Sequence, residues 1–433
     1  MTRENTDASD TCAEDYLQRA EHAAFSHPAV GSGDASPRPL RKVGIIGAGT
    51  MGGGIAMNFL NKGISVCLLD AAPGGLDAGV ARVRANYQRS VDRGKLSVQA
   101  LEDRMALLQR GASIRDISDC ELVIEAVFED LDVKRSVFAE IDRWANPDAI
   151  LATNTSYLDV NAIAAATRRP DAVVGMHFFS PANVMRLVEV VRASHTSEAV
   201  ISAAISVARS IEKIPVVVGV CHGFVGNRMS FARRAQANAL VQEGVMPWDV
   251  DRVLEEFGMP MGPFAMMDLA GLDIGWSIGK SQGVTDLKHR LCELGRFGQK
   301  AGAGYYSYDP DTRSRSVDPD VRTLVEEYAR TSGRVIRDVS DKEILERCLY
   351  AVVNEGARIL EEGIARCASD IDLVWVNGFG WPRSRGGPMF WADSIGLEHV
   401  LDRVQFYERQ HGADWTPAEL LKRSVAQSKR FTH

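Results

Sequence analysis

The stretch KVGIIGAGTMGGGIAMNFLNKGISVCLLD, residues 42–70, decides the fold of this chain. It joins a β-branched run to the turn Gly47-x-Gly49-x-x-Gly52, then to a helical stretch, and then to a second apolar run that ends in Asp70. The three glycines suit a tight turn, a close approach of the backbone to a pyrophosphate, and close packing of helix against strand. Because strand, helix, second strand and terminal acid occur together, the stretch predicts a dinucleotide-binding βαβ unit.

The same stretch indicates which dinucleotide binds. A pyrophosphate would lie at the helix N-terminus, where free N–H groups and the helix dipole favour negative charge. Asp70 suits the adenosine ribose hydroxyls and would repel a 2′-phosphate, and residues 71–73 supply no arginine to receive one. A glycine-rich turn without a ligand is the less favoured alternative. We predict that NAD binds to Gly47, Gly49, Thr50, Met51, Gly52 and Asp70.

Composition excludes several classes of protein. The chain has 433 residues, enough for several domains, and a net charge of -7, which argues against nucleic-acid binding. It contains no apolar run long enough to cross a bilayer, and its first thirty residues lack the pattern of a signal peptide. The seven cysteines are scattered singly, which favours a reducing compartment over disulfides or a zinc site. We therefore expect a cytoplasmic protein without a metal, a nucleic-acid partner or a membrane partner.

The pattern along the chain predicts an α/β region followed by an all-α region. Residues 1–40 look like an appendage with a short helix around 12–25 and a Pro-rich linker. Strand-like runs then alternate with helical stretches, which predicts a Rossmann-type NAD-binding domain over 41–221. Its strand-like runs are residues 42–47, 65–70, 121–127, 149–154 and 214–219.

The helical part contains an internal repeat. One set of glycines, prolines and acids recurs with the same internal spacing, apart from an insertion around GWPRSRGG: Glu243-Gly244, Gly262-Pro263, Asp268 and Gly271-Leu272 match Glu362-Gly363, Gly387-Pro388, Asp393 and Gly396-Leu397. Two copies of one helical unit explain this match better than chance similarity. We predict two tandem helical units, over 222–330 and 331–433.

Two ionisable residues stand out in VVGMHFFSPANVMRLVEVV, residues 173–191. If both ends of the stretch are strands, the period of two places His177 and Glu189 on apolar faces. A buried imidazole or carboxylate is costly unless it is paired. A satisfied core histidine and a strand-edge acid would be the ordinary interpretation of either residue alone.

Five motifs give the chain a resemblance to a known family. GAGTMGGGIA, IEAVFED, TNTSYL, GMHFFSPANVMRLVEVV and GFVGNRM, in this order, resemble the L-3-hydroxyacyl-CoA dehydrogenases of fatty-acid β-oxidation over about residues 41–433. With GQKAGAGYYSYDP and the duplicated helical unit, the chain is most similar to the dehydrogenase half of the multifunctional β-oxidation enzymes. Those enzymes carry a hydratase/isomerase region ahead of the dehydrogenase, for which about forty residues are too few. We therefore expect a freestanding dehydrogenase with a remnant linker.

The resemblance implies an activity and a set of site residues. The activity is NAD-dependent interconversion of (3S)-3-hydroxyacyl-CoA and 3-ketoacyl-CoA. The roles that it implies are a general base at His177 with a carboxylate partner at Glu189, a hydroxyl for the substrate C3 oxygen at Ser156, an amide for the histidine or the thioester at Asn227, and contacts near the nicotinamide and its ribose from Glu129, Lys134 and Asn154. A carboxylate beside an imidazole favours its charged form and offsets its desolvation.

Several of these residues have ordinary structural alternatives. Ser156, with Asp159 three residues on, fits a helix cap, and so does Asn227. Glu129 and Lys134 lie at a charged helix start, which is usually solvated. The sequence also departs from the single-unit family members, which commonly read HFFNP where this chain has Ser180, so the resemblance assigns no role to that position.

Other functions and the assembly state are left open by the sequence. One alternative is a β-hydroxyacid dehydrogenase for free acids, although those enzymes use a lysine where this chain has Asn227 and Arg228. Another is a non-catalytic dinucleotide-binding protein. The second helical unit has Glu346 and Arg347 at the offset of Asn227, so we expect one active site. We also expect a monomer that binds an acyl-CoA thioester and that is compatible with association with other β-oxidation enzymes.

Overall fold

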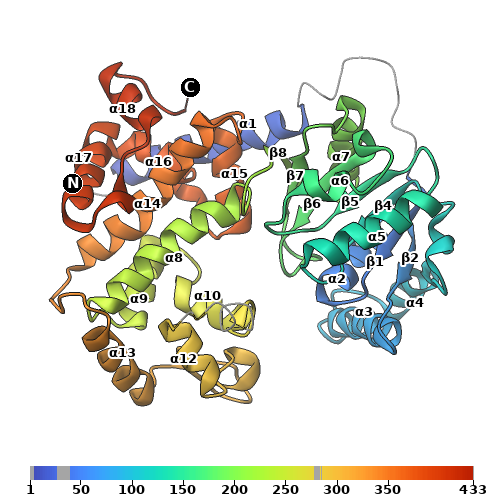
Figure 1. The fold of residues 1–433 in the computed structure, drawn as a ribbon, viewed down its shortest axis with the longest axis horizontal. Helices are drawn as coiled ribbons and strands as arrows, with labels where there is room; N and C mark the ends of the chain where they lie inside the picture. The colour runs from blue at the N-terminus through green and yellow to red at the C-terminus, as the bar shows by residue number, and fades with distance from the viewer. Residues whose placement is uncertain (1–3, 27–39, 277–282, 284, 433) are drawn as a thin grey trace.

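The chain folds into an α/β region and a helical region (Figure 1). The computed structural model describes residues 4–26, 40–276, 283 and 285–432. The Pro-rich linker predicted over residues 27–39 lies outside the described residues. No helix among the described residues is both long enough and apolar enough to span a bilayer.

The α/β region is built on one eight-stranded sheet, in the order β3-β2-β1-β4-β5-β6-β7-β8. The pairings are parallel except between β6 and β7, which run antiparallel. The order reverses direction between β1 and β4, and in such sheets ligands bind at the carboxyl ends of the strands beside that reversal. The strands are β1 (Lys42–Ile46), β2 (Ser65–Leu69), β3 (Leu108–Arg110), β4 (Leu122–Glu125), β5 (Ile150–Thr153), β6 (Val173–Phe178), β7 (Leu187–Arg192) and β8 (Ile214–Gly219).

Helices cover both faces of this sheet, as the alternation of residues along β1 requires. Val43 and Ile45 belong to one buried core and Ile46 to the other, because successive side chains of a strand point to opposite faces. The covering helices are α2 (Thr50–Leu60), α3 (Gly75–Asp92), α4 (Val98–Ala106), α5 (Leu131–Trp144), α6 (Val160–Ala164) and α7 (Glu198–Ser210), with short 3₁₀ turns at Ile114–Ile117 and Pro170–Ala172. The predicted Rossmann-type fold is confirmed.

The second region is mainly helical, as predicted. Its elements are α8 (Gly226–Gln242), α9 (Pro247–Phe257), α10 (Pro263–Ala270), α12 (Leu287–Glu293), α13 (Pro319–Thr331), α14 (Asp341–Glu361), α15 (Ala368–Gly378), α16 (Pro388–Ile395), α17 (Leu397–His411) and α18 (Glu419–Ala426). A hairpin of two short strands, β9 (Ser307–Tyr308) and β10 (Arg315–Ser316), and 3₁₀ turns at Gln299–Ala301, Arg383–Arg385 and Ala413–Trp415 complete it.

The repeat predicted from the sequence has a structural counterpart at two helix starts. Asp251 accepts hydrogen bonds from the first N–H groups of α10, at Phe264 and Ala265. Asp372 accepts the corresponding bonds at the start of α16, from Met389 and Phe390. Each buried carboxylate thus satisfies helix N–H groups that have no partner within the helix.

The two copies meet along α8 and α14, and their ion pairs are reciprocal. Arg228 at the start of α8 pairs with Glu362 just after α14. Arg347 near the start of α14 pairs with Glu243 just after α8, at 2.9 Å. A first copy and a second copy therefore cover each other within one chain.

The N-terminal helix differs from the predicted appendage. Helix α1 (Glu4–Phe25) is longer than expected and packs against α7, β8 and α15, so it joins both regions. Leu17 is fully buried, and the Tyr16 hydroxyl donates to Asp372 at 2.7 Å. Arg383 pairs with both Glu14 and Glu21 at 2.9 Å. These contacts fix α1 in the fold, in the position seen in Figure 1.

Candidate active site

The glycine turn between β1 and α2 has the geometry of a pyrophosphate site. Gly47 has a φ of 104°, and a Cβ there would lie 2.4 Å from the Ala126 carbonyl oxygen. A Cβ on Gly52 would lie 1.8 Å from the Gly47 carbonyl oxygen, so the helix packs too closely for any side chain. A Cβ on Gly49 would meet open space, which leaves room for a ligand to approach the backbone. Helix α2 starts at Thr50 without an acid in its first turn, so its N-terminus favours an anion.

Asp70 follows β2 at the same edge of the sheet. Its two carboxylate oxygens accept the N–H groups of Ala48 at 2.7 Å and Ala72 at 2.8 Å. These bonds fix the carboxylate beside the glycine turn while the side chain stays half-buried. The arrangement fits a dinucleotide whose adenosine ribose carries free hydroxyls, because a 2′-phosphate would meet this negative charge.

His177 and Glu189 face each other across the antiparallel pair β6 and β7. They are directly paired in register, and the imidazole Nδ1 lies 2.7 Å from Glu189 Oε2. The exposed fractions are 4% and 0%. With Nδ1–H donated to the carboxylate, the ring nitrogen left for a reactant is Nε2. The predicted meeting of the two side chains is confirmed, and a separate core histidine and strand-edge acid are excluded.

The start of α8 holds the other oxygen of Glu189. Oε1 accepts the N–H groups of Val225 at 3.2 Å and Gly226 at 2.9 Å. Both donors belong to the helix N-terminus, where the dipole stabilises negative charge. Glu189 therefore joins the sheet to the first helical unit and presents a fixed charge to His177.

Asn227 and Ser156 lie together in this corner. Asn227 Nδ2 donates to the Ser156 carbonyl oxygen at 3.1 Å. The cap alternatives for both residues are wrong, because Val225 is the N-cap of α8 and Asp159 caps α6. Neither side chain therefore caps the neighbouring helix.

The remaining predicted residues lie at the carboxyl ends of β4 and β5. Glu129 Oε1 accepts the Ser156 N–H and the Thr155 hydroxyl, both at 2.6 Å. Asn154 Oδ1 accepts the Phe178 N–H at 2.8 Å, next to His177. Glu129 and Asn154 thus help to fix the strand ends that carry the site.

Lys134 does not lie on a solvated helix face, which corrects that alternative. It is fully buried, and its ammonium lies 2.7 Å from Glu125 Oε1 and 3.3 Å from Glu129 Oε2. The ammonium therefore points into the protein, beneath the carboxyl end of β4. Lys134 can act on a bound cofactor only through the two carboxylates that it contacts. Glu125 was not identified from the sequence, although an acid inside the apolar run LVIEAV, residues 122–127, was a usable signal.

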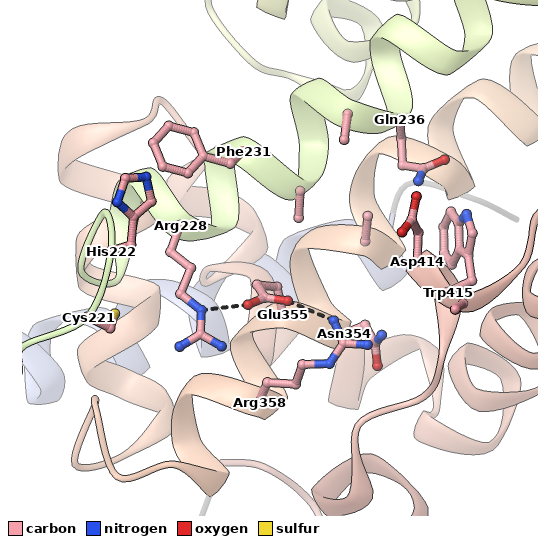
Figure 2. Close-up of a pocket in the computed structure, with 14 residues that line it drawn as sticks. Cys221, His222, Arg228, Phe231, Gln236, Asn354, Glu355, Arg358, Asp414 and Trp415 are labelled. Carbon is pink, nitrogen blue, oxygen red and sulfur yellow. Dashed lines mark hydrogen bonds and ion pairs between the residues drawn. The ribbon is translucent and has the colours of Figure 1, made fainter. Parts of the chain in front are cut away.

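A hollow of about 780 Å³ lies elsewhere, between α8 and α14 (Figure 2). Arg228 crosses it to Glu355, with Nε 2.6 Å from Oε1, and Arg358 and Asn354 lie on the α14 side. The residues that line it do not include the His177 and Glu189 pair. Its ion pairs join the two helical units, and it is not the site built from the sheet.

Comparison with known proteins agrees with the two-region plan. The NAD-binding domain of 3-hydroxyacyl-CoA dehydrogenase matches residues 42–221, and the C-terminal domain of the same enzyme matches residues 223–308 and 344–432. The chain is 43% identical over 416 residues to the peroxisomal bifunctional enzyme of Cavia porcellus, which covers 91% of this chain and 57% of that protein. The chain thus spans a little over half the length of this relative.

Two solved structures are also similar. The dehydrogenase part of multifunctional enzyme 1 from C. elegans is 30% identical, covers 95% of this chain and 98% of that one, and has a TM-score of 0.68. The 3-hydroxybutyryl-CoA dehydrogenase from Escherichia coli is 26% identical, covers 90% and 99% of the two chains, and has a TM-score of 0.76.

The comparisons overturn one prediction. The curated relatives are named as peroxisomal or glyoxysomal enzymes, so the expected cytoplasmic location is wrong. Unpaired cysteines cannot distinguish the cytoplasm from the peroxisome, because they indicate the redox state of a compartment and not which compartment it is.

The glycine turn, the Asp70 carboxylate and the matched NAD-binding domain together make NAD the cofactor of this chain. Both regions match one family in its own domain order. The chain belongs to the 3-hydroxyacyl-CoA dehydrogenase family.

Proposed function

We propose that the protein interconverts (3S)-3-hydroxyacyl-CoA and 3-ketoacyl-CoA with NAD. The observation that carries the proposal is the 2.7 Å contact between His177 Nδ1 and Glu189 Oε2, across strands β6 and β7 of the NAD-binding sheet. A histidine held in this way has one nitrogen free for proton transfer and one fixed by a carboxylate. The CoA thioester as substrate class comes from the family and from the names of the relatives.

In the proposed mechanism, His177 acts as the general base. Its Nε2 takes the proton of the substrate 3-hydroxyl, while Nδ1–H stays bonded to Glu189 and the carboxylate stabilises the imidazolium that forms. NAD, when bound, supplies the hydride acceptor. The Ser156 hydroxyl would bond the C3 oxygen, and the Asn227 amide would hold the backbone of Ser156 and the thioester end of the substrate.

Each remaining site residue has a place in this proposal. Gly47, Gly49, Thr50, Met51 and Gly52 would hold the pyrophosphate at the start of α2, and Asp70 would hold the adenosine ribose. Glu129 and Asn154 would stand near the nicotinamide, with Lys134 behind them. Support comes from the positions of these residues at the carboxyl ends of β1, β2, β4 and β5.

The test is reduction of acetoacetyl-CoA and a longer 3-ketoacyl-CoA, each with NADH and with NADPH. We expect turnover with NADH and a rate lower by about 10²–10⁴ in His177→Gln, the usual contribution of a general acid–base group, with cofactor affinity retained. His195→Gln is the matched control, because His195 is exposed on the surface. Equal rates in the wild type and His177→Gln would remove the proposed base.

The same assay separates the alternatives. Oxidation of free 3-hydroxybutyrate as fast as its CoA thioester would favour a free-acid dehydrogenase, and NADH binding without turnover would favour a non-catalytic protein. Arg228 lies at the position where the free-acid enzymes were expected to have their lysine. Its guanidinium forms ion pairs with Glu355 and Glu362. This engagement leaves it poorly placed to replace their lysine.

The proposal extends to domain division, assembly and location. We propose domains over 41–221, 222–330 and 331–433, which is supported by the matched ranges. A monomer is supported by the mutual covering of α8 and α14, and association with other β-oxidation enzymes by the names of the relatives. Those names also support a peroxisomal location, which fluorescence microscopy of the tagged protein would test.

A further inference from the structure

Glu125 is a buried acid at the end of a central strand. It is the last residue of β4, is 0% exposed, and follows Val123 and Ile124, which are also buried. Its Oε1 accepts the Lys134 ammonium and the Val127 N–H, both at 2.7 Å, and its Oε2 accepts the Thr153 hydroxyl at 2.8 Å. The carboxylate thus joins β4, β5 and α5 at one point.

A continuous polar chain runs from this point to the active-site corner. The Lys134 ammonium touches Glu125 on one side and, at 3.3 Å, Glu129 Oε2 on the other. The second oxygen of Glu129 accepts the Ser156 N–H at 2.6 Å. The Ser156 carbonyl is held from the opposite side by Asn227. The orientation of Ser156 therefore depends on the Glu125 carboxylate, three contacts away through Lys134 and Glu129.

Stability gives no sufficient reason for this arrangement. Replacing a buried ion pair by apolar residues of similar volume is often neutral or stabilising, because desolvation offsets the attraction. The strand around Glu125 is apolar, and an apolar residue would fit its pattern. What an apolar residue could not do is fix Lys134, the Val127 N–H and, through the ammonium, the direction of Glu129.

We propose that Glu125 is a positioning residue for the dehydrogenase reaction. It orients Glu129 through Lys134, and Glu129 places the Ser156 hydroxyl that meets the substrate C3 oxygen. The inference rests on the proposed function, since it assigns Glu125 a task in that reaction. It predicts that the effect of Glu125 on catalysis passes through Ser156.

The test is a cycle of variants assayed with acetoacetyl-CoA and NADH. Glu125→Gln/Lys134→Met removes both fully buried charges together, while the partly exposed Glu129 keeps its hydrogen bonds from Thr155 and Ser156. We expect kcat to fall roughly tenfold in the otherwise wild-type protein and less than about twofold in a Ser156→Ala background, because residues that act as a unit are non-additive. The NADH affinity of Glu125→Gln alone, measured by fluorescence, should change by less than about threefold, because Glu125 has no assigned contact with the cofactor.

A matched control separates positioning from general destabilisation. Glu243→Gln/Arg347→Met removes a similarly buried pair in the helical region, with side chains 5% and 0% exposed, and should lower thermal stability without changing kcat. If the Glu125 double variant does not fold, Glu125→Gln alone keeps the side-chain shape and is compared in the same two backgrounds.

The outcomes are distinct. Equal fold losses with and without the Ser156 hydroxyl would overturn the positioning role while leaving the reaction itself intact. Absence of turnover in the wild type would instead overturn the proposed function. A loss confined to the background that retains Ser156 supports the inference.

Discussion

Tyr16→Phe removes one hydroxyl from the contact that fastens α1 to the second helical unit. The hydroxyl donates to Asp372 Oδ2 at 2.7 Å, across a separation of 356 residues. Asp372 is 0% exposed, and its remaining bonds come from the backbone N–H groups of Met389 and Phe390. The substitution leaves the aromatic ring in place and takes away only this donor.

The cost of the change depends on pH. Burial raises the pKa of Asp372 from 3.8 to about 8, partly opposed by the hydrogen bond from Tyr16. Between pH 4 and 8 the Asp372 carboxyl is protonated in the folded state and ionised in the unfolded state. The contribution of Asp372 to the free energy of unfolding therefore falls as pH rises from about 4 to 8 and is constant above. Without the Tyr16 donor, the folded-state pKa rises further and ionisation costs more. We expect a loss of about 1 kcal/mol at pH 6, where the carboxyl is neutral, and about 2–3 kcal/mol at pH 9, where it is charged.

Urea unfolding followed by tryptophan fluorescence measures this difference. Trp375, Trp381 and Trp391 lie in the second helical unit, so the signal reports the affected region. Tyr306→Phe is the matched control, because the Tyr306 hydroxyl donates to Asp251 at 2.8 Å in the first copy.

The control should respond at a different pH. Burial raises the pKa of Asp251 only to about 6, so the loss in Tyr306→Phe should reach its full size by about pH 7. Midpoint shifts in Tyr16→Phe that are the same at pH 6 and pH 9, or larger at pH 6, would refute the reasoning.

Three other predictions concern the site and the assembly. Asp70→Asn keeps one of the two acceptors for the N–H groups of Ala48 and Ala72 and removes the charge that repels a 2′-phosphate, so the ratio of kcat/KM for NADPH to that for NADH should rise about tenfold; an unchanged ratio in parallel assays would refute this role. Glu189→Gln should lower kcat at least about a hundredfold, because the imidazolium loses its carboxylate, and combining it with His177→Gln should add little. Light scattering should give a mass near 47.3 kDa, and a stable dimer held through α8 would count against mutual covering of the two helical units.

The fold was predictable where short-range pattern decides structure. The glycine turn and the alternation of β-branched runs with helical stretches predicted a parallel sheet, since each strand and helix follows from its own residues. The pairing of His177 with Glu189 was predictable from the family resemblance, and the cost of burying either group without a partner agrees with it. The spacing repeated in the helical part predicted the two matching helix starts.

Long-range contacts were not predictable in this way. The charges around Lys134 are typical of a solvated helix start, and only the packing of α5 on β4 turns its ammonium inward to Glu125. Helix α1 has an ordinary amphipathic sequence, and its partners Asp372 and Arg383 follow more than 350 residues later. Neither contact can be inferred from the residues that are adjacent in the sequence.

The repeat explains why Tyr16 of α1 bonds to the second helical unit. In the first copy, Asp268 accepts the Tyr306 N–H and the hydroxyl of the same residue reaches Asp251. In the second copy, Thr432 stands in the matching place against Asp393, and its hydroxyl bonds Asp393 itself at 2.6 Å.

A threonine is too short to repeat the reach of a tyrosine, so the second copy does not supply its own phenol to Asp372. Tyr16 supplies that phenol from α1. Because α1 also packs on α7 and β8, the same hydrogen bond that completes the second helical unit fastens it to the NAD-binding sheet. The N-terminal helix therefore supplies the hydroxyl that the second copy lacks and joins the two regions of the protein.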